Sequence, residues 1–554
     1  YSLFSMVVVN SNFNTNPFRR RRRTKGKPKK VTIRQLVLGF LAVLLLQAIL
    51  ANFFWLASSP ERAGDGTSTT SEHLLRKNTS PKSDDGALIL LPNNETVTCI
   101  AWRATENCQP QGPLLASTFI SNFVDTDLSC NEYIPGYASG YCELRTESGT
   151  IVKAYKKGCH HGGRHAPYQF KAFLPRMKCQ DAVAFSNYKY LAHAYEPALE
   201  MSIPQSTATP TRGIVMEIYE SVLPSVYSIV QLLRQVYNCQ LPIELWHIEG
   251  EIDDDNPIIQ KLLQKYKNSI QIRIIQSRNI QSYRTKAYSI AYTYFDQVLS
   301  LDSDTFPTKD PTYLFDTPEF QSQGAIFWKD FWLTERNDYV MNQNSEVWEL
   351  LGLEHNAIAR TEMEMESGQL LVDRRKSQKA LKVLLFLSET FEEFLDPLYL
   401  VWGDKDLFRL SWHMTEIPFH YIHQPPNTAG YTVLTWLNLD RVCGVTMVQH
   451  DPAGHPVFFH RNGVKLSSRS SLKKIWEKGL EFMGKDVATE YDIEGSTEWP
   501  VYYAMCGCYH PKAYVREYFR EIDYRGTDVE AWEETILDFA REALDILNGK
   551  GSVS

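Results

Sequence analysis

The sequence has no glycine-rich loop of the kinds that hold nucleotide phosphates. No Gly-x-Gly-x-x-Gly run follows the first strand expected in the central part of the chain, residues 213–217, and no P-loop motif is present. Dinucleotide-binding folds and P-loop proteins place the phosphates of their ligands on such loops. These absences argue against hydride transfer and against ATP hydrolysis.

The sequence also lacks the cysteine spacing of a zinc finger and an overall excess of basic residues. Cys159-His160-His161 and Cys506-Gly507-Cys508 have metal-binding residue types, but no Cys-x-x-Cys pair stands at finger spacing, which disfavours a zinc site. The 554-residue chain has a net charge of −7. The body of the chain therefore gives no support to a nucleic-acid partner.

Acidic residues are absent from residues 1–35, which are strongly basic and include the run Arg19–Arg23. A basic run also occurs in nuclear signals and nucleic-acid arms. Here it abuts 36–57, a mostly apolar segment of about 22 residues, long enough to cross a bilayer and too long for a cleaved signal peptide. We therefore expect a cytosolic tail at 1–35, a transmembrane signal-anchor at 36–57 and a lumenal remainder. Because the chain starts at Tyr1 and not at Met, we expect its natural start to lie upstream.

The segment after the anchor has the composition of a secreted stem and a disulfide-rich subdomain. Residues 58–95 are rich in Ser, Thr, Gly and charge, which predicts a flexible stem with sequons at Asn78 and Asn94. Six of the ten cysteines crowd into residues 96–210, and they are Cys99, Cys108, Cys130, Cys142, Cys159 and Cys179. In an oxidising lumen they predict a subdomain braced by disulfides, with open connectivity.

From residue 211 the pattern alternates between strands and helices. Strands are expected at 213–217, 243–247 and 270–275 and just before Asp302, and helices at 222–237, 257–267, 283–295 and 404–413. This alternation predicts an α/β domain at 211–550 with a mostly parallel, Rossmann-like sheet covered by helices. An amphipathic helix at 532–547 is expected to pack on this domain.

Asp302 and Asp304 follow the buried strand that ends at Leu301. An isolated Asp-x-Asp pair is commoner in solvated turns. In an α/β sheet, however, ligands bind at the carboxyl ends of strands. There two carboxylates can converge on a hard cation such as Mn²⁺ or Mg²⁺, which would neutralise a departing diphosphate.

Five blocks occur in an order that resembles one family. They are Leu241–His247, Leu301–Asp304, Phe327–Trp332, Glu366–Asp373 and Gly403–Asp406. Together they resemble the fungal-type α-mannosyltransferases of glycosyltransferase family 71, over residues 211–465. The resemblance implies a GT-A-like fold and a Golgi type II enzyme that adds α-1,2- or α-1,3-linked mannose from GDP-mannose. Residues 217–220 lack the small side chains expected at the first strand-loop.

The resemblance also suggests residues for the metal and the donor. The segment from His460 to Lys465 is similar to the His-, Gly- and Lys-containing motif of glycogenin-like enzymes. It adds His460 to Asp302 and Asp304 as a metal ligand, with His450 and His455 as rivals. The residues assigned to the donor are Tyr219, Lys286, Asp302, Gly463 and Lys465. Gly463 would let the backbone approach the diphosphate, and Lys465 would neutralise it.

Trp328, Asp330 and Trp332 are assigned to the acceptor, because aromatic faces suit sugars. The alternative is a core aromatic pair around a solvated Asp330. Glu366, Asp404 and Lys405 are assigned to mannose transfer, although Asp404 could instead cap its helix. A protein nucleophile and a front-face mechanism without one both remain open.

The sequence thus predicts a metal-dependent, retaining mannosyltransferase of the Golgi membrane that uses GDP-mannose and Mn²⁺ (or Mg²⁺). Its partners would be a mannose-terminated glycan on a glycoprotein and the membrane, without nucleic acid. One alternative is a galactosyl- or glucosyltransferase of the same fold that uses a UDP-sugar. The other is a catalytically silent Golgi glycan-binding protein, against which the cluster of Asp302, Asp304 and His460 argues.

Overall fold

The computed structural model describes most of the chain from residue 89 onward. The described residues are 89–90, 96–106, 126–134, 139–157, 177–180, 188–201, 209–253, 255–276, 284–333, 348, 351–353, 363–390, 395, 401, 403–434, 440–496 and 508–549. The basic tail, the anchor expected at 36–57, both sequons and most of the stem lie outside them. Among the helices that are described, none combines the length and the apolar character needed to cross a bilayer.

A seven-stranded mixed sheet forms the centre of the domain. Its strands, in spatial order, are β14 (His420–Tyr421), β12 (Ala325–Leu333), β13 (Met363–Asp373), β10 (Gln297–Leu301), β7 (Arg212–Glu217), β8 (Ile243–Ile248) and β9 (Ile270–Ile275). Strands β10, β7, β8 and β9 are parallel to one another, and β13 runs antiparallel to both β10 and β12. The α/β class and the parallel strands are as predicted from sequence, and the antiparallel β13 is an addition.

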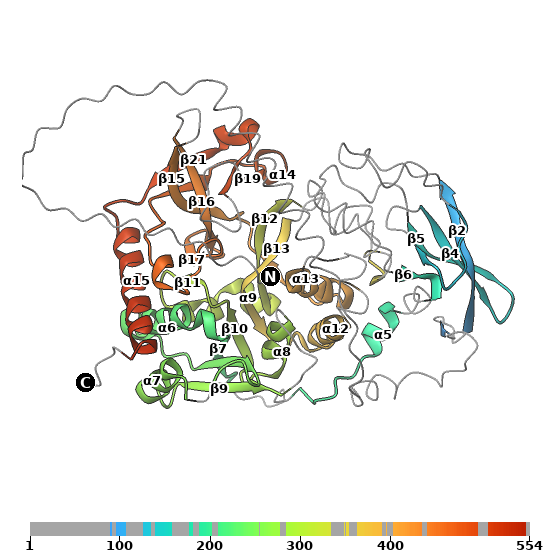
Figure 1. Cartoon of the computed structure of the whole chain (residues 1–554), viewed down its shortest axis with the longest axis horizontal. Helices are drawn as coiled ribbons and strands as arrows, with labels where there is room; N and C mark the ends of the chain where they lie inside the picture. The colour runs from blue at the N-terminus through green and yellow to red at the C-terminus, as the bar shows by residue number, and fades with distance from the viewer. Residues whose placement is uncertain are drawn as a thin grey trace, which may run out of the picture. The chain divides into compact units, whose positions relative to one another are not determined.

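Helices cover both faces of this sheet because its strands alternate apolar side chains between two cores (Figure 1). In β7, Ile214 and Met216 point to one core and Val215 to the other. The first core is closed by α6 (Leu223–Gln231), α7 (Pro257–Lys265) and α15 (Asp528–Leu547). The second is closed by α8 (Arg284–Tyr292), α12 (Gln378–Glu389) and α13 (Asp404–Thr415).

Two predicted helices differ in their details from the expectation. The helix expected at 222–237 consists of a 3₁₀ turn at Glu220–Val222, then α6, then a π-helical turn at Leu232–Val236. The C-terminal helix begins at Asp528, earlier than expected, because Thr527 caps it by accepting from the Val529 amide. As predicted, its apolar face packs on the domain.

A second, eight-stranded sheet was not predicted. Its main path is β11 (Thr305–Pro307), β17 (Pro456–His460), β16 (Asp440–His450), β15 (Asn427–Leu434), β18 (Lys478–Phe482) and β21 (Phe519–Asp523), with β19 (Ile493–Ser496) and β20 (Cys508–Pro511) off this path. The disulfide Cys443–Cys508 joins β16 to β20. Because β10 ends at Leu301 and β11 begins at Thr305, the Asp-x-Asp pair lies where the chain passes from one sheet to the other.

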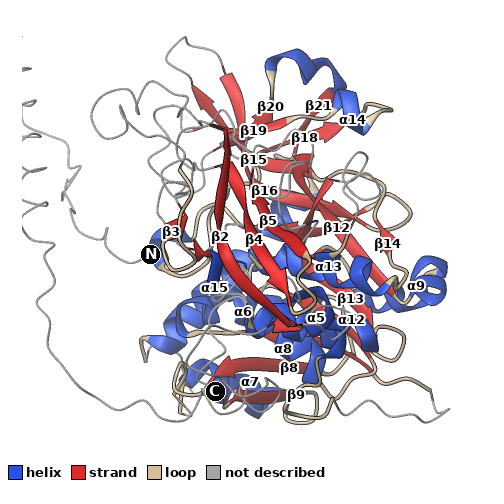
Figure 2. Cartoon of the chain, turned by 90° about the vertical axis from the view of Figure 1, so that its right-hand side faces the viewer, coloured by secondary structure: helices blue, strands red, loops and turns tan. Residues whose placement is uncertain are grey.

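The cysteine-rich segment contains a four-stranded antiparallel sheet. Its order is β1 (Ile89–Leu90), β2 (Thr96–Glu106), β4 (Ser139–Thr146) and β5 (Ile151–Lys157), and Figure 2 shows β2, β4 and β5 side by side. The disulfides Cys99–Cys130 and Cys142–Cys179 brace this segment, as predicted. Cys108 and Cys159 lie outside the described residues.

Candidate metal and nucleotide-sugar site

Strand pairing brings the site residues together at the junction of the two sheets. Leu301 of β10 pairs with Gln369 of β13, and the Asp302 amide donates to the Gly368 carbonyl oxygen at 2.8 Å. On the other side, Thr305 of β11 pairs with His460 of β17. The Asp-x-Asp pair is therefore held between Glu366 and Gly368 of one sheet and His460 of the other.

Among the residues that the structure describes, one group offers metal-ligating atoms that all lie within 4.8 Å of one another. Its members are Asp302, Glu366 and His460. Nδ1 of His460 lies 3.5 Å from Oε1 of Glu366. Two carboxylates and an imidazole are a donor set that suits Mn²⁺ and also Mg²⁺. Glu366 joins this group, although the sequence assigned it to sugar transfer.

Asp304 lies beside the same group and is 1% exposed. Its Oδ1 is 3.2 Å from Nε2 of His460, and its Oδ2 is 2.9 Å from Nζ of Lys465. Burial by itself raises the pKa of Asp304, but the charges of His460 and Lys465 outweigh it and hold the pKa below its usual range. Neither oxygen of Asp304 makes a hydrogen bond of good geometry, and neither does Nδ1 of His460. Buried oxygen and nitrogen atoms without a well-formed hydrogen bond suit coordination of a cation, so the residues present fit the predicted metal.

The charge on His460 depends on these acids. Burial lowers the pKa of His460, but the carboxylates of Asp304 and Glu366 raise it to about 9. The neighbouring acids thus favour the protonated imidazole while no cation is bound. Coordination through a ring nitrogen would require that proton to leave, so metal binding at this site would release a proton.

Lys286 connects Asp302 to Asp404. Its buried ammonium lies 2.6 Å from Oδ1 of Asp302 and 3.5 Å from Oδ2 of Asp404, and it donates to the Ser367 carbonyl oxygen at 2.8 Å. Burial lowers the pKa of Lys286, but the two carboxylates raise it above its usual range. An ammonium has three N–H donors. Those of Lys286 point to protein groups here, and its predicted contact with the donor stays a prediction.

Glu217, at the end of β7, is a site residue that the sequence interpretation missed. It accepts a hydrogen bond from Oγ of Ser289, and burial raises its pKa to about 7 against the opposing charge of Lys286. An acid at the carboxyl end of a strand parallel to β10 was a signal that could have found it. Nearby, Tyr219 is 42% exposed and lies in the electrostatic field of Lys465.

Asp404 and Lys405 begin α13, behind the metal-ligating group. Gly403 takes the N-cap position, so Asp404 does not cap the helix, and its Oδ2 accepts from Oγ of Ser367 at 3.2 Å. Burial raises the pKa of Asp404, and Lys286 opposes this. Lys405 forms a buried ion pair with Asp330 of β12.

The three residues assigned to the acceptor have different surroundings. Trp328 is fully buried, and its indole N–H donates to the His450 carbonyl oxygen at 2.8 Å. In this conformation Trp328 presents no face to a sugar. Asp330 is buried against Lys405, so it is not the solvated acid of the alternative hypothesis. Trp332 is half-buried, with its ring 6.2 Å from that of Tyr509.

Two glycines are required by close contacts at the site. A Cβ on Gly368 would lie 2.7 Å from Nδ1 of His460. A Cβ on Gly463 would lie 2.8 Å from the Val445 carbonyl oxygen, to which the Gly463 amide donates. Packing against β16 thus explains Gly463 without a ligand, and its predicted role at the diphosphate stays a prediction.

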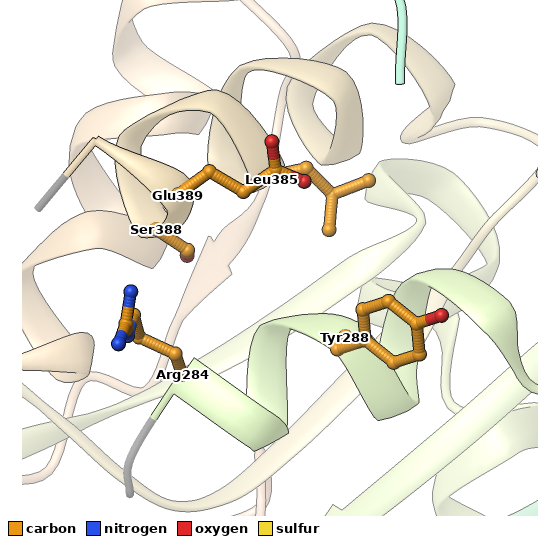
Figure 3. Close-up of a pocket in the computed structure, with 5 residues that line it drawn as sticks. All are labelled: Arg284, Tyr288, Leu385, Ser388 and Glu389. Atoms are coloured by element: carbon orange, nitrogen blue, oxygen red, sulfur yellow. The ribbon is translucent and has the colours of Figure 1, made fainter. Parts of the chain in front are cut away.

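The rival histidines lie outside the metal-ligating group. His450 is buried, with Nε2 3.1 Å from Nδ2 of Asn427, while the imidazole of His455 is exposed and lies 3.5 Å from Oδ1 of Asp451. A small pocket between α8 and α12 is also separate from this group (Figure 3). It is lined by Arg284, Tyr288, Leu385, Ser388 and Glu389.

Residues 211–451 match the family described as putative mannosyltransferases. We refer to residues 211–451 below as the mannosyltransferase segment. The mannosyltransferase segment contains Asp302, Asp304 and Glu366, whereas His460, Lys465 and α15 lie beyond the matched residues.

The chain is similar to curated mannosyltransferases of yeasts. It is 22% identical over 262 residues to alpha-1,2-mannosyltransferase MNN2 of Saccharomyces cerevisiae, which covers 41% of this chain and 43% of that protein. It is 33% identical over 98 residues to alpha-1,2-mannosyltransferase MNN21 of Candida albicans, which covers 17% and 15% of the two chains. The chain thus spans less than half the length of each of these relatives.

Among solved structures, the chain resembles the mannosyltransferase Ktr4p of S. cerevisiae, solved in complex with GDP. The identity is 12%, the match covers 44% of this chain and 78% of that one, and the TM-score is 0.26. At this TM-score the likeness says nothing about the chemistry of the mannosyltransferase segment.

Proposed function

We propose that this protein is a metal-dependent, retaining mannosyltransferase with a GT-A-like catalytic domain, which moves mannose from GDP-mannose to a mannose-terminated glycan. The observation that carries the proposal is the cluster of Asp302, Asp304, Glu366 and His460 at the end of β10. It lies at the carboxyl edge of the parallel strands, where α/β sheets bind ligands. The match to the mannosyltransferase family supports mannose as the transferred sugar.

Within this proposal, Asp302, Asp304, Glu366 and His460 would hold Mn²⁺ or Mg²⁺. When bound, such an ion supplies Lewis-acid stabilisation of the diphosphate leaving group. The side chain of Lys465 is 48% exposed while its Nζ contacts Asp304, so the ammonium can also reach a ligand. It would contribute a fixed positive charge beside the departing phosphate.

Asp404 is the acid best placed to orient the transferring mannose. Ser367 and Lys286 fix its carboxylate at the start of α13, beside the metal-ligating group. A carboxylate held in this way can accept hydrogen bonds from sugar hydroxyls without a loss of side-chain freedom on binding. Lys405 would act through Asp330, with which it forms an ion pair. The choice between a protein nucleophile and a front-face mechanism stays open.

The cellular setting belongs to the proposal too. The basic tail at 1–35 and the apolar segment at 36–57 support a type II anchor in the Golgi membrane, with the catalytic domain in the lumen. The disulfides are consistent with an oxidising compartment. The names of the relatives favour an α-1,2 linkage over the α-1,3 alternative.

A donor panel tests the proposal. The purified protein is given GDP-mannose, UDP-galactose or UDP-glucose with a mannoside acceptor, in Mn²⁺ or in chelator, beside an Asp304→Asn variant. The proposal predicts release of GDP from GDP-mannose that requires Mn²⁺ and is lost in the variant. Turnover of a UDP-sugar alone would contradict the mannose assignment. Turnover of no donor, together with binding of mannosides, would favour a glycan-binding protein.

A further inference from the structure

Glu533 in α15 is a buried carboxylate that reaches the loop after His460. It is fully shielded from solvent. Its Oε1 accepts from Nη1 of Arg461 at 2.7 Å and from the Ile475 amide at 2.8 Å, and its Oε2 accepts from the Trp476 amide at 3.0 Å. One side chain of the C-terminal helix thus binds both ends of the loop at 461–476.

Arg461 extends this network to the acids of the site. Its backbone amide donates to the Asp304 carbonyl oxygen at 2.9 Å. Its side chain is fully buried and donates from Nε to the Val464 carbonyl oxygen and from Nη2 to the Lys473 carbonyl oxygen, each at 2.8 Å. Arg461 therefore fixes the loop that carries Lys465 relative to Asp304.

The ion pair between Arg461 and Glu533 has the geometry to fix one conformation of the loop. A planar guanidinium presents its donors in a rigid fork, which here reaches two carbonyl oxygens and one carboxylate. Buried ion pairs give little net stability compared with apolar packing, but the loss of one partner leaves an uncompensated buried charge. The pair is thus suited to hold one loop conformation, and the Coulomb attraction alone does not explain its presence.

Aromatic packing fixes the same helix beside the same strand. The rings of Trp476 and Trp532 stack at 5.0 Å, and Phe459, which precedes His460 in β17, lies 5.0 Å from Trp476 and 5.1 Å from Trp532. Helix α15 also packs on α6, where Tyr227 donates to Glu542 at 2.7 Å (Figure 1).

We propose that Glu533 is a positioning residue of the transferase. Through Arg461 it holds the segment from His460 to Lys465 against Asp304, so that the C-terminal helix is part of the cation and diphosphate site. This inference rests on the proposed function for what the site binds. It concerns residues beyond 451, where the match to the mannosyltransferase family ends.

The test compares Glu533→Gln with Asp538→Asn in the full chain. Asp538 lies on the same helix, its side chain is 62% exposed, and it pairs with Arg541 of α15 rather than with the loop at 461–476. Three quantities are measured: amide hydrogen exchange at 462–476, Mn²⁺ affinity from the electron paramagnetic resonance signal of free Mn²⁺, and the midpoint of thermal unfolding. The Michaelis constants for GDP-mannose and for the acceptor are also measured for each protein.

We expect faster exchange at 462–476 in Glu533→Gln and Mn²⁺ affinity weaker by about tenfold, as is typical when a group that orients a metal ligand is lost. The Michaelis constant for GDP-mannose should rise while that for the acceptor does not. Asp538→Asn should match the wild type in every measurement. Unchanged Mn²⁺ affinity and unchanged exchange at 462–476 in folded Glu533→Gln would overturn the proposal. So would a general loss of protection and thermal stability without loss of Mn²⁺ affinity.

A second variant covers the case in which Glu533→Gln does not fold. Arg461→Lys keeps a positive charge for Glu533 but cannot reach the Val464 and Lys473 carbonyl oxygens together. It should show the same faster exchange and weaker Mn²⁺ binding, and wild-type behaviour in both would overturn the proposal. If the wild type binds no Mn²⁺ and turns over no GDP-mannose, the proposed function fails. Loop exchange in the two variants then still decides whether Glu533 positions this segment.

Discussion

The buried ammonium of Lys286 pairs with the partly exposed carboxylate of Asp302, with Nζ 2.6 Å from Oδ1. The same ammonium lies 3.5 Å from Asp404. One lysine thus sets the distance between an acid that belongs to the metal-ligating group and an acid that we assign to the sugar.

Replacement of Lys286 by Met should separate cation binding from turnover. Without the ammonium, Asp404 loses a partner that holds it beside Asp302 and moves, and a small misplacement of a group that orients the sugar costs about a hundredfold in rate. Mn²⁺ affinity should not fall, because the site becomes more negative. The check is kcat with GDP-mannose beside Mn²⁺ binding. Parallel loss of both would contradict this account of Lys286.

Gly368→Ala should weaken the cation site directly. The added Cβ would stand 2.7 Å from Nδ1 of His460 and 3.1 Å from Oε1 of Glu366. Displacement of these two groups should reduce Mn²⁺ affinity by about tenfold or more. Gly495→Ala is the matched control, because its Cβ would meet no atom closer than 3.8 Å. Equal Mn²⁺ affinity in the two variants would show that Gly368 has no such role.

Removal of the disulfide in the second sheet should destabilise the fold. Cys443 and Cys508 are 65 residues apart in sequence, and closing a loop of that length in the unfolded chain corresponds to about 4 kcal/mol in the chain-entropy model. The Cys443→Ala/Cys508→Ala variant should lose free energy of unfolding of that order. Denaturant unfolding under non-oxidising conditions without added reductant measures it. An unchanged unfolding midpoint would contradict the prediction.

His450 should make stability depend on pH below neutrality. Burial lowers its pKa to about 4, with Asp451 opposing, so the unfolded chain binds a proton between pH 6.5 and 4 that the folded chain does not. The free energy of unfolding should therefore fall as the pH drops through this window, by up to about 3 kcal/mol for this group. The His450→Gln variant should lack this part of the pH dependence. The comparison requires unfolding curves of both proteins at several pH values, and parallel pH profiles would refute the assignment.

The parallel strands could be predicted because their signals are local. The segments that became β7, β8 and β9 are short runs of β-branched and other apolar residues, and each is followed by a helix or turn. The second sheet had no such signal, because it depends on pairing between β11 and β17, which are far apart in the chain. The antiparallel direction of β13 depends on its pairing with β10, which is also distant in the chain.

The site residues also fall into those with a local sequence signal and those that depend on long-range pairing. Asp302, Asp304 and His460 could be found because each belongs to a short motif, and strand pairing brings them together. Glu366 was given another role, because its contact with His460 requires the pairing of β10 with β13. Trp328 was placed at the acceptor because an aromatic residue in β12 carries no sign of which face it occupies. Its burial follows from the packing of the second sheet, which supplies the His450 carbonyl oxygen.

The most direct measurement of the central claim is the structure of the product. The purified protein is incubated with GDP-mannose, a mannoside acceptor and Mn²⁺, and the new linkage is identified by proton nuclear magnetic resonance, with a chelator-treated sample beside it. The account predicts a new α-mannosidic bond that forms only in the presence of the metal. A β-linked product, transfer that continues in chelator, or transfer of a sugar other than mannose would contradict it.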